Sequence, residues 1–439
     1  MLRPLRPSLL FLLLLLYPLL INCSRPRPHI LSKRNPTYSP ISSSPSLSQL
    51  SQLTNLDQNL DYQDPTSLLS QILIPRAVGS KNLTKVQDLI VKRFEQLNWH
   101  VERDTFTTTT PLGPKTFTNL IFTHDPLASR TFVLSAHLDS KYFPHPPQDQ
   151  FVGATDSAVP CALLVDLAQS LTPLLDSLKS IVTRQGGKGA IEGQDGTWIQ
   201  GETLQIVFFD GEEAFVDWTD KDSIYGAKHL VDKWSQPNST PRTPLNVVPS
   251  KPLERISHLI LLDLLGAPNP VIRNFHQSTG WLFDEFLHSE HKLGYEGLLW
   301  PGLSGKTYEA RISKGGGGNG VKEKSFFLDR KGPQGWMGSI EDDHIPFLKK
   351  GVPVVHLISV PFPKVWHTIK DDASALDLDT IKAWALIVRL TVAEYLGLDP
   401  TESNRPKEVR ANEEVEDGER IGMGKRNGDE LIHPRTTAQ

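Results

Sequence analysis

The sequence contains little cysteine and no excess of positive charge. Only two cysteines occur among 439 residues, Cys23 and Cys161. Cys23 lies where removal of an N-terminal signal would take it away, so we expect no disulfide within the mature chain. The formal net charge is −4, from 46 lysines and arginines against 50 aspartates and glutamates. Since nucleic-acid binders are usually basic, we expect no nucleic-acid partner.

One apolar run at the N-terminus indicates the cellular location of the protein. It extends from Leu9 to Ile21 and follows Arg3 and Arg6. This pattern is typical of a signal peptide, and the run is shorter than the ~20 residues of a membrane span. We predict a signal peptide over residues 1–24, secretion, and no stable membrane association after cleavage. The alternative is an uncleaved anchor in the Golgi or the endoplasmic reticulum.

The remainder of the chain divides by composition. Residues 25–58 are rich in serine, proline and leucine without a period, and residues 400–439 are charged and nearly free of aromatics, so we predict disorder in both. Residues 59–399 hold enough apolar material for a single catalytic domain, and we expect order to begin there. Two sequons, Asn82-Leu83-Thr84 and Asn238-Ser239-Thr240, are compatible with glycosylation.

Short apolar strands alternate with helices across this domain. Apolar residues at helical spacing predict helices over 84–97, 161–175, 224–234 and 379–396. Extended apolar runs predict a hairpin over 101–109 and 115–123, and strands over 131–136, 204–209, 259–263 and 352–358. The alternation predicts an α/β fold with a central mixed, mostly parallel sheet flanked by helices. Segments 180–202, 235–254 and 303–335 have loop-like composition and are predicted to be surface insertions.

Acidic and imidazole side chains follow several of these strands. Open α/β sheets place their sites beyond the carboxyl ends of the strands, so we expect the side chains to converge there. They are His137 and Asp139 after the strand at 131–136, Glu212 and Glu213 after 204–209, Asp263 at the end of 259–263, His367 beyond 352–358, and Asp156 before the helix at 161–175.

The adjacent pair Glu212 and Glu213 is the most informative of these features. Two neighbouring carboxylates repel each other unless a cation lies nearby or one is protonated. A catalytic zinc takes about three protein ligands and keeps one position open, and an unliganded carboxylate beside that position suits a general base. An isolated acidic pair is more often a solvated turn, but aromatic residues flank this one in FFDGEEAF. The residues alone indicate a zinc hydrolase-like site with one metal or two.

Around these residues the sequence resembles the animal glutaminyl-peptide cyclotransferases, which share a fold superfamily with the zinc aminopeptidases. The matching stretches are AHLDSKYF at 136–143, FVGATDSAVPCALL at 151–164, FFDGEEAFVDW at 208–218, LLDLLGAPNP at 261–270, and DDHIPFLKKGVPVVHLI with PFPKVWHT within 342–368. The resemblance implies a zinc exopeptidase-like fold. It also implies cyclisation of N-terminal glutamine, and more slowly glutamate, of peptides and proteins to pyroglutamate.

The resemblance also implies a role for individual residues. Asp156, Glu213 and His367 would bind one zinc per chain, Glu212 would be the acid/base, Asp263 and Asp342 would form a hydrogen-bond network, and Trp218, Trp366 and Phe362 would wall the substrate pocket. The chain departs from the family where Ala136 stands in place of a cysteine that would pair with Cys161, and where Glu341 replaces a common glutamine. We expect a buried, hydrogen-bonded His356, and His344 close to Asp342 and Asp343.

Two alternatives remain open. A two-zinc aminopeptidase could use His137, Asp156, Glu213, Asp263 and His367 as ligands, with Glu212 activating a bridging water. A non-catalytic binding protein on the same scaffold would typically lack a ligand or the base, and none is missing here. We expect a monomer that acts on peptide or protein substrates.

Overall fold

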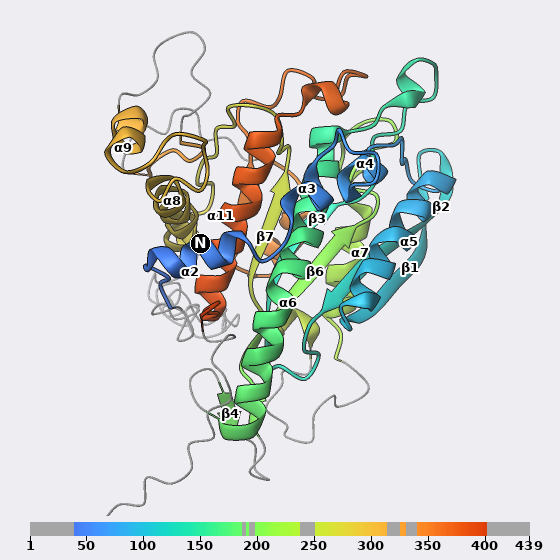
Figure 1. The fold of residues 1–439 in the computed structure, drawn as a ribbon. Coiled ribbons are helices and arrows are strands. Elements are labelled where there is room, and N and C mark those ends of the chain that lie inside the picture. The colour runs from blue at the N-terminus through green and yellow to red at the C-terminus, as the bar shows by residue number, and fades with distance from the viewer. Residues whose placement is uncertain are drawn as a thin grey trace, which may run out of the picture. The chain divides into compact units, whose positions relative to one another are not determined.

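The structure is a computed structural model that describes residues 39–186, 190–192, 198–237, 251–313, 325–330 and 340–401 (Figure 1). These residues all fall within one compact unit, Met1–Ser403. The predicted signal peptide, the sequon at Asn238 and nearly all of the predicted C-terminal tail lie outside the described residues.

A six-stranded mixed sheet forms the centre of the fold, with the strand order β1-β2-β6-β3-β7-β8. Its bounds are β1 His100–Thr110, β2 Gly113–Thr123, β3 Arg130–His137, β6 Glu202–Phe209, β7 Ile256–Asp263 and β8 Val354–Ile358. Strands β6, β3, β7 and β8 run parallel, while the β1–β2 hairpin joins β6 in antiparallel direction. The predicted mixed, mostly parallel sheet is confirmed.

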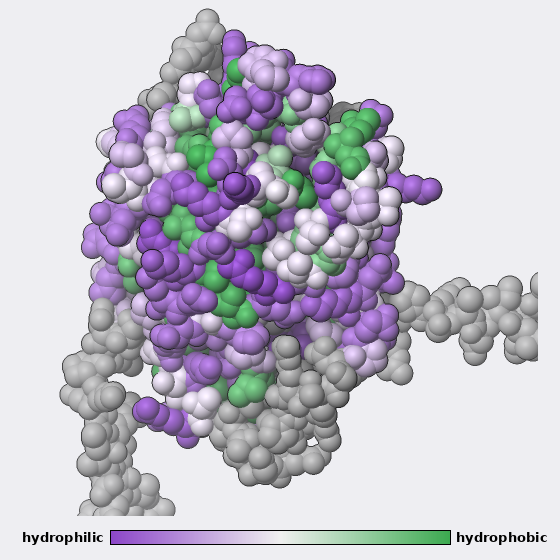
Figure 2. Space-filling model, turned by 90° about the vertical axis from the view of Figure 1, so that its right-hand side faces the viewer, coloured by the Kyte–Doolittle hydropathy of each residue, from purple (hydrophilic) through white to green (hydrophobic). Residues whose placement is uncertain are grey.

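Helices cover both faces of this sheet. They are α2 Ser44–Ser51, α3 Leu56–Leu60, α4 Leu68–Ile72, α5 Lys81–Gln96, α6 Val159–Gln185, α7 Tyr225–Trp234, α8 Gly280–Tyr295, α9 Gly305–Ser313, α10 His344–Lys349 and α11 Leu378–Leu396. Side chains alternate across a strand, so Phe132 and Leu134 enter the larger core with α5, α6 and α11, whereas Val133 enters the core with α7 and α10. On the face shown in Figure 2, apolar residues form small separate patches.

Helix α6 lies in the larger core. Among the described residues, the stretch Gln148–Gln185 that contains it is the one segment long and apolar enough to cross a membrane. The apolar window of this stretch is 89% buried inside the fold.

The fold begins earlier than the composition indicates. Helices α2 and α3 lie within the segment for which we predicted disorder, and Leu47 and Leu50 of α2 are only 2% and 1% exposed. The prediction is therefore wrong for residues 39–58. Arg389 of α11 is fully buried and holds this segment, because its guanidinium donates to Leu50 O at 3.0 Å and to Asp166 Oδ2 at 2.7 Å.

The segment 180–202 also differs from its predicted loop. Helix α6 continues to Gln185, ten residues beyond the predicted end, and the short strands β4 (Ala190–Glu192) and β5 (Trp198–Gln200) pair in antiparallel direction. Part of the third predicted insertion is helical as well, in α9. The glycine-rich stretches that indicated loops, at 186–189, 193–196 and 315–320, lie almost entirely outside the described residues, and the helices and strands form on the residues beside them.

We expect Arg389→Met to lower the free energy of unfolding by about 3–5 kcal/mol, because the buried Asp166 carboxylate would lose its charged partner. Urea denaturation measures the effect. The control is Lys251→Ala, since Lys251 pairs with Glu254 at 3.5 Å on the surface, where such a pair contributes about 1 kcal/mol or less. An equal loss in both variants would contradict the role given to Arg389.

Candidate active site

A pocket of about 480 Å³ opens at the carboxyl ends of β3, β6, β7 and β8. Its lining includes all nine predicted site residues, Asp156, Glu212, Glu213, Trp218, Asp263, Asp342, Phe362, Trp366 and His367, together with Lys141 and Glu341. The structure therefore brings together, at the strand ends, the side chains that the sequence singled out.

Asp156, Glu213 and His367 come together on one side of this pocket. His367 Nε2 lies 3.2 Å from Glu213 Oε1 and 3.5 Å from Asp156 Oδ2. Both carboxylate oxygens are buried and have no hydrogen-bond partner among the described residues. Burial, and next the neighbouring Glu213 carboxylate, raise the pKa of Asp156 to about 7. Two buried, unpartnered oxygens facing an imidazole nitrogen fit a divalent cation, and the three residues are suitable ligands for zinc.

The backbone around Asp156 depends on a glycine. Asp156 lies in the helical turn Ala154–Ala158, directly before α6. Gly153 precedes this turn with a φ of 63°, and a Cβ added there would collide with Asp156 O. The motif GATD therefore needs glycine at its first position in order to turn the aspartate into the pocket.

Asp139 holds the loop that carries Glu212 and Glu213. Its carboxylate accepts the backbone N–H groups of Gly211, Glu212 and Glu213 at 2.9, 3.2 and 3.3 Å. Lys141 Nζ then donates to Glu213 Oε2 at 3.2 Å. One oxygen of Glu213 is thus held by a lysine, while the other faces His367.

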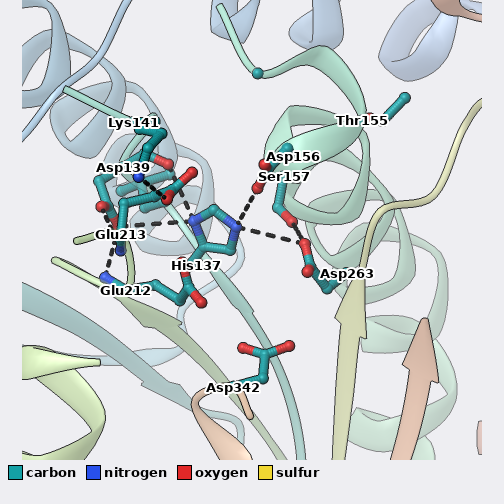
Figure 3. A network of polar contacts seen from close by, with 12 residues as sticks. His137, Asp139, Lys141, Thr155, Asp156, Ser157, Glu212, Glu213, Asp263 and Asp342 are labelled. Carbon is teal, nitrogen blue, oxygen red and sulfur yellow. Dashed lines mark hydrogen bonds and ion pairs between the residues drawn. The ribbon is translucent and has the colours of Figure 1, made fainter. Parts of the chain in front are cut away.

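His137 lies between this loop and Asp263 (Figure 3). Its Nε2 is 2.9 Å from Asp156 Oδ1 and 3.4 Å from Asp263 Oδ1. Burial alone lowers the pKa of His137, but its hydrogen bonds to the neighbouring aspartates raise it well above the ordinary value. These three residues also have the arrangement of a metal-binding group, so the residues that a second metal would need are present and contact one another.

Glu212 lies beside the triad, and its side chain lines the pocket. It is 7% exposed. Burial raises the pKa of Glu212 well above its ordinary value, with the Glu213 and Asp342 carboxylates adding to the effect. A carboxyl group with a raised pKa is suited to both accepting and returning a proton near neutral pH.

Aromatic residues form the outer wall of the pocket. Trp218 and Trp366 are 39% and 40% exposed. The Phe362 and Trp366 rings lie 5.0 Å apart, and Trp366 stacks on His367 at 3.8 Å. Trp218 Nε1 donates to Glu341 Oε2 at 3.1 Å. The rim therefore offers flat apolar surface beside the polar interior.

Asp342 lines the pocket and contacts His356. His356 Nε2 is 2.8 Å from Asp342 Oδ2, and Asp343 N donates to Asp342 Oδ1 at 2.6 Å. The expectation of a buried, hydrogen-bonded His356 is confirmed, since this residue is 3% exposed.

Three residues that position the site escaped the sequence analysis. Ser157 donates to Asp263 Oδ1. Asp222 accepts the N–H groups of the loop before Trp218, and Asp371 Oδ1 accepts Thr155 N at 2.9 Å. Asp371 is 216 residues from Thr155 in the sequence, so no local motif marks it. Ser157, by contrast, directly follows Asp156 in GATDS and could have been chosen on that basis.

Comparison with known proteins assigns the family. Residues 119–295 and 322–392 match the model of peptidase family M28. The chain is 41% identical to the glutaminyl-peptide cyclotransferase of Bos taurus over 332 residues, which make up 75% of this chain and 81% of the bovine one. The chain belongs to the glutaminyl-peptide cyclotransferase family.

Two further cyclotransferases extend the similarity. The Drosophila melanogaster glutaminyl-peptide cyclotransferase is 39% identical over 344 residues, covering 78% of this chain and 82% of its own. The crystal structure of the Macrostomum lignano glutaminyl cyclase matches with a TM-score of 0.64 and 35% identity, over 83% of this chain and 96% of that one. The resemblance noted in the sequence and the zinc exopeptidase-like fold are thereby confirmed.

Membership in the glutaminyl-peptide cyclotransferase family identifies the chain as an enzyme. The alternative of a non-catalytic binding protein is therefore not supported. The broader M28 family is of the peptidase type, so the M28 match alone would leave both reactions open. The cyclotransferase relatives favour the cyclisation reaction over aminopeptidase action.

Proposed function

We propose that this enzyme cyclises the N-terminal glutamine of peptides and proteins to pyroglutamate with release of ammonia, and acts more slowly on N-terminal glutamate. The observation that carries the proposal is a buried carboxyl group, Glu212, beside three converging candidate ligands in an aromatic-walled pocket. The relatives bear the name of this reaction, which supports it further.

In this proposal Asp156, Glu213 and His367 hold one zinc ion per chain. When bound, zinc would act as a Lewis acid on the γ-carbonyl of the substrate glutamine. The unpartnered oxygens of Asp156 and Glu213 support the assignment, because a buried charge without a partner is costly.

Glu212 would be the group that moves the proton. It takes a proton from the substrate α-amine, which attacks the γ-carbonyl within the same residue, and it returns the proton to the departing ammonia. Since both reacting groups belong to one residue, the pocket chiefly has to fold and desolvate that residue. Trp218, Trp366 and Phe362 would provide the flat walls that such a compact ring needs.

Asp263 and Asp342 would act as a supporting network rather than as metal ligands. Asp263 accepts from Ser157 and lies 3.4 Å from His137 Nε2, and Asp342 is paired with His356. His137 already contacts Asp156 directly at 2.9 Å. The His137, Asp156 and Asp263 group is the observation that supports the two metals of an aminopeptidase. The cyclotransferase relatives support the one-metal assignment instead.

The cellular location and the oligomeric state of the enzyme follow from the N-terminal sequence and the family resemblance only as proposals. We propose that the chain enters the secretory pathway and acts as a secreted monomer without a stable membrane anchor. The sequon at Asn82 supports this route, since Asn82 is exposed at the start of α5. Mapping of glycans on the secreted protein tests the proposal.

Removal of the metal tests the proposed chemistry. We expect a heterocyclic chelator to abolish cyclisation of a glutamine-initiated peptide, and added zinc to restore it. We also expect about one zinc per chain after dialysis against metal-free buffer, in line with a catalytic site of three ligands. About two tightly held zinc ions together with aminopeptidase turnover would overturn the proposal in favour of the two-metal enzyme.

A further inference from the structure

A second group of potential metal ligands lies beside the pocket. It consists of Asp342, His344 and His356, here called the Asp342–His344–His356 cluster. Each of the three offers one ligand atom, and these atoms all lie within 4.8 Å of one another. His344 begins α10 and His356 lies in β8, so two packed elements hold the group. It shares no residue with the Asp156, Glu213 and His367 triad.

The cluster is buried and its polar groups are incompletely satisfied. Asp342, His344 and His356 are 2%, 2% and 3% exposed. Among the described residues, His344 Nδ1 has no hydrogen-bond partner, and neither oxygen of the fully buried Asp343 carboxylate has one. Unsatisfied buried polar groups are rare because each costs free energy. A cation held through His344 Nδ1 would satisfy this nitrogen.

The imidazoles of the cluster lie close together. The His344 ring lies 4.4 Å from the His356 ring and 5.3 Å from the His276 ring. A neutral imidazole keeps a free lone pair, which is the form that ligates zinc. Two imidazoles and one carboxylate also make a ligand set that zinc accepts.

We propose that the Asp342–His344–His356 cluster is a second zinc site whose occupation inhibits the enzyme. Asp342 belongs both to this cluster and to the lining of the pocket. An ion bound here would compete for Asp342 Oδ2, which is now 2.8 Å from His356 Nε2, and would draw the carboxylate away from its present position. The site would bind more weakly than the triad, because the ion has to displace this hydrogen bond.

Zinc titration of the full-length, tag-free holoenzyme tests the inference. Zinc chloride is added after dialysis, and bound metal and peptide turnover are both recorded. We expect a second zinc to bind as turnover falls. We expect His344→Gln to need at least about tenfold more zinc for both effects, since even loss of an outer-shell partner weakens metal sites by about 10–100-fold. Inhibition is expressed relative to each variant's turnover without added zinc.

A control separates this site from other histidines. His288→Gln makes the same change at a side chain that is 57% exposed, and we expect it to titrate as the unaltered enzyme does. Circular dichroism verifies that both variants are folded, and cobalt titration gives a second readout through the visible spectrum of the His-ligated ion. Equal zinc sensitivity of His344→Gln and the unaltered enzyme, or no second zinc at all, would overturn the inference. Neither outcome depends on which peptide reaction the enzyme catalyses, because metal binding is measured directly.

Discussion

Glu212→Gln is expected to lower kcat for a glutamine-initiated peptide by about 10²–10⁴-fold, the usual contribution of a general acid/base. The substitution preserves the size of the side chain but removes its ability to take up the proton of the α-amine. We expect KM to change far less than kcat, because Glu212 assists the transition state by transferring a proton and contributes little to binding of the substrate before reaction. Stopped-time assays with product separation give both constants.

Metal content shows whether Glu212 acts as a base or as a ligand. We expect Glu212→Gln to retain its zinc, because Asp156, Glu213 and His367 provide the ligands in the proposed site. The matched control is Glu254→Gln, which makes the same change at a surface side chain that is 55% exposed, and we expect it to keep full turnover. Turnover close to that of the unaltered enzyme in Glu212→Gln would contradict the assigned role.

His367→Ala is expected to lose its zinc on dialysis and to lower kcat/KM by about 10³-fold or more. His367 is the one nitrogen ligand of the triad, and its Nε2 faces the unpartnered oxygens of Asp156 and Glu213. Two carboxylates alone are a poor zinc site, since protein zinc sites usually take three or four ligands. Lewis-acid assistance contributes several kcal/mol, which corresponds to the expected loss.

The control for this variant is His288→Ala, at the exposed histidine of α8. We expect it to retain zinc and turnover. Zinc analysis before and after dialysis, with circular dichroism to verify folding, measures the difference. Unchanged zinc content in His367→Ala would show that the metal lies elsewhere in the chain.

Much of the fold follows from apolar patterning. Strand β7 is buried at every position, and its run of apolar residues predicted both the strand and Asp263 at its end. Because parallel strands end at the same edge of the sheet, the candidate ligands that follow them lie together there. Ligand types alone did not distinguish one metal from two. Only the resemblance to the cyclotransferases, through the residues around Glu212 and His367, favours one metal.

What the sequence did not reveal depends on contacts between distant residues. Arg389 bonds to Asp166 across 223 residues, and this pairing helps to order α2 and α3 in a serine-rich segment. Asp139 was chosen as a candidate ligand at a strand end, but its carboxylate binds three backbone amides more than 70 residues away. Composition and periodicity describe local preference, and they carry no information about such partners.

Product analysis by mass spectrometry tests the central claim most directly. The purified enzyme is incubated with a glutamine-initiated peptide and with the same peptide beginning with leucine. The proposed function predicts that the first peptide loses one ammonia and keeps its full number of residues, while the second is unchanged. Release of the first residue from either peptide, with no ammonia-loss product, would contradict the claim and identify the enzyme as an aminopeptidase.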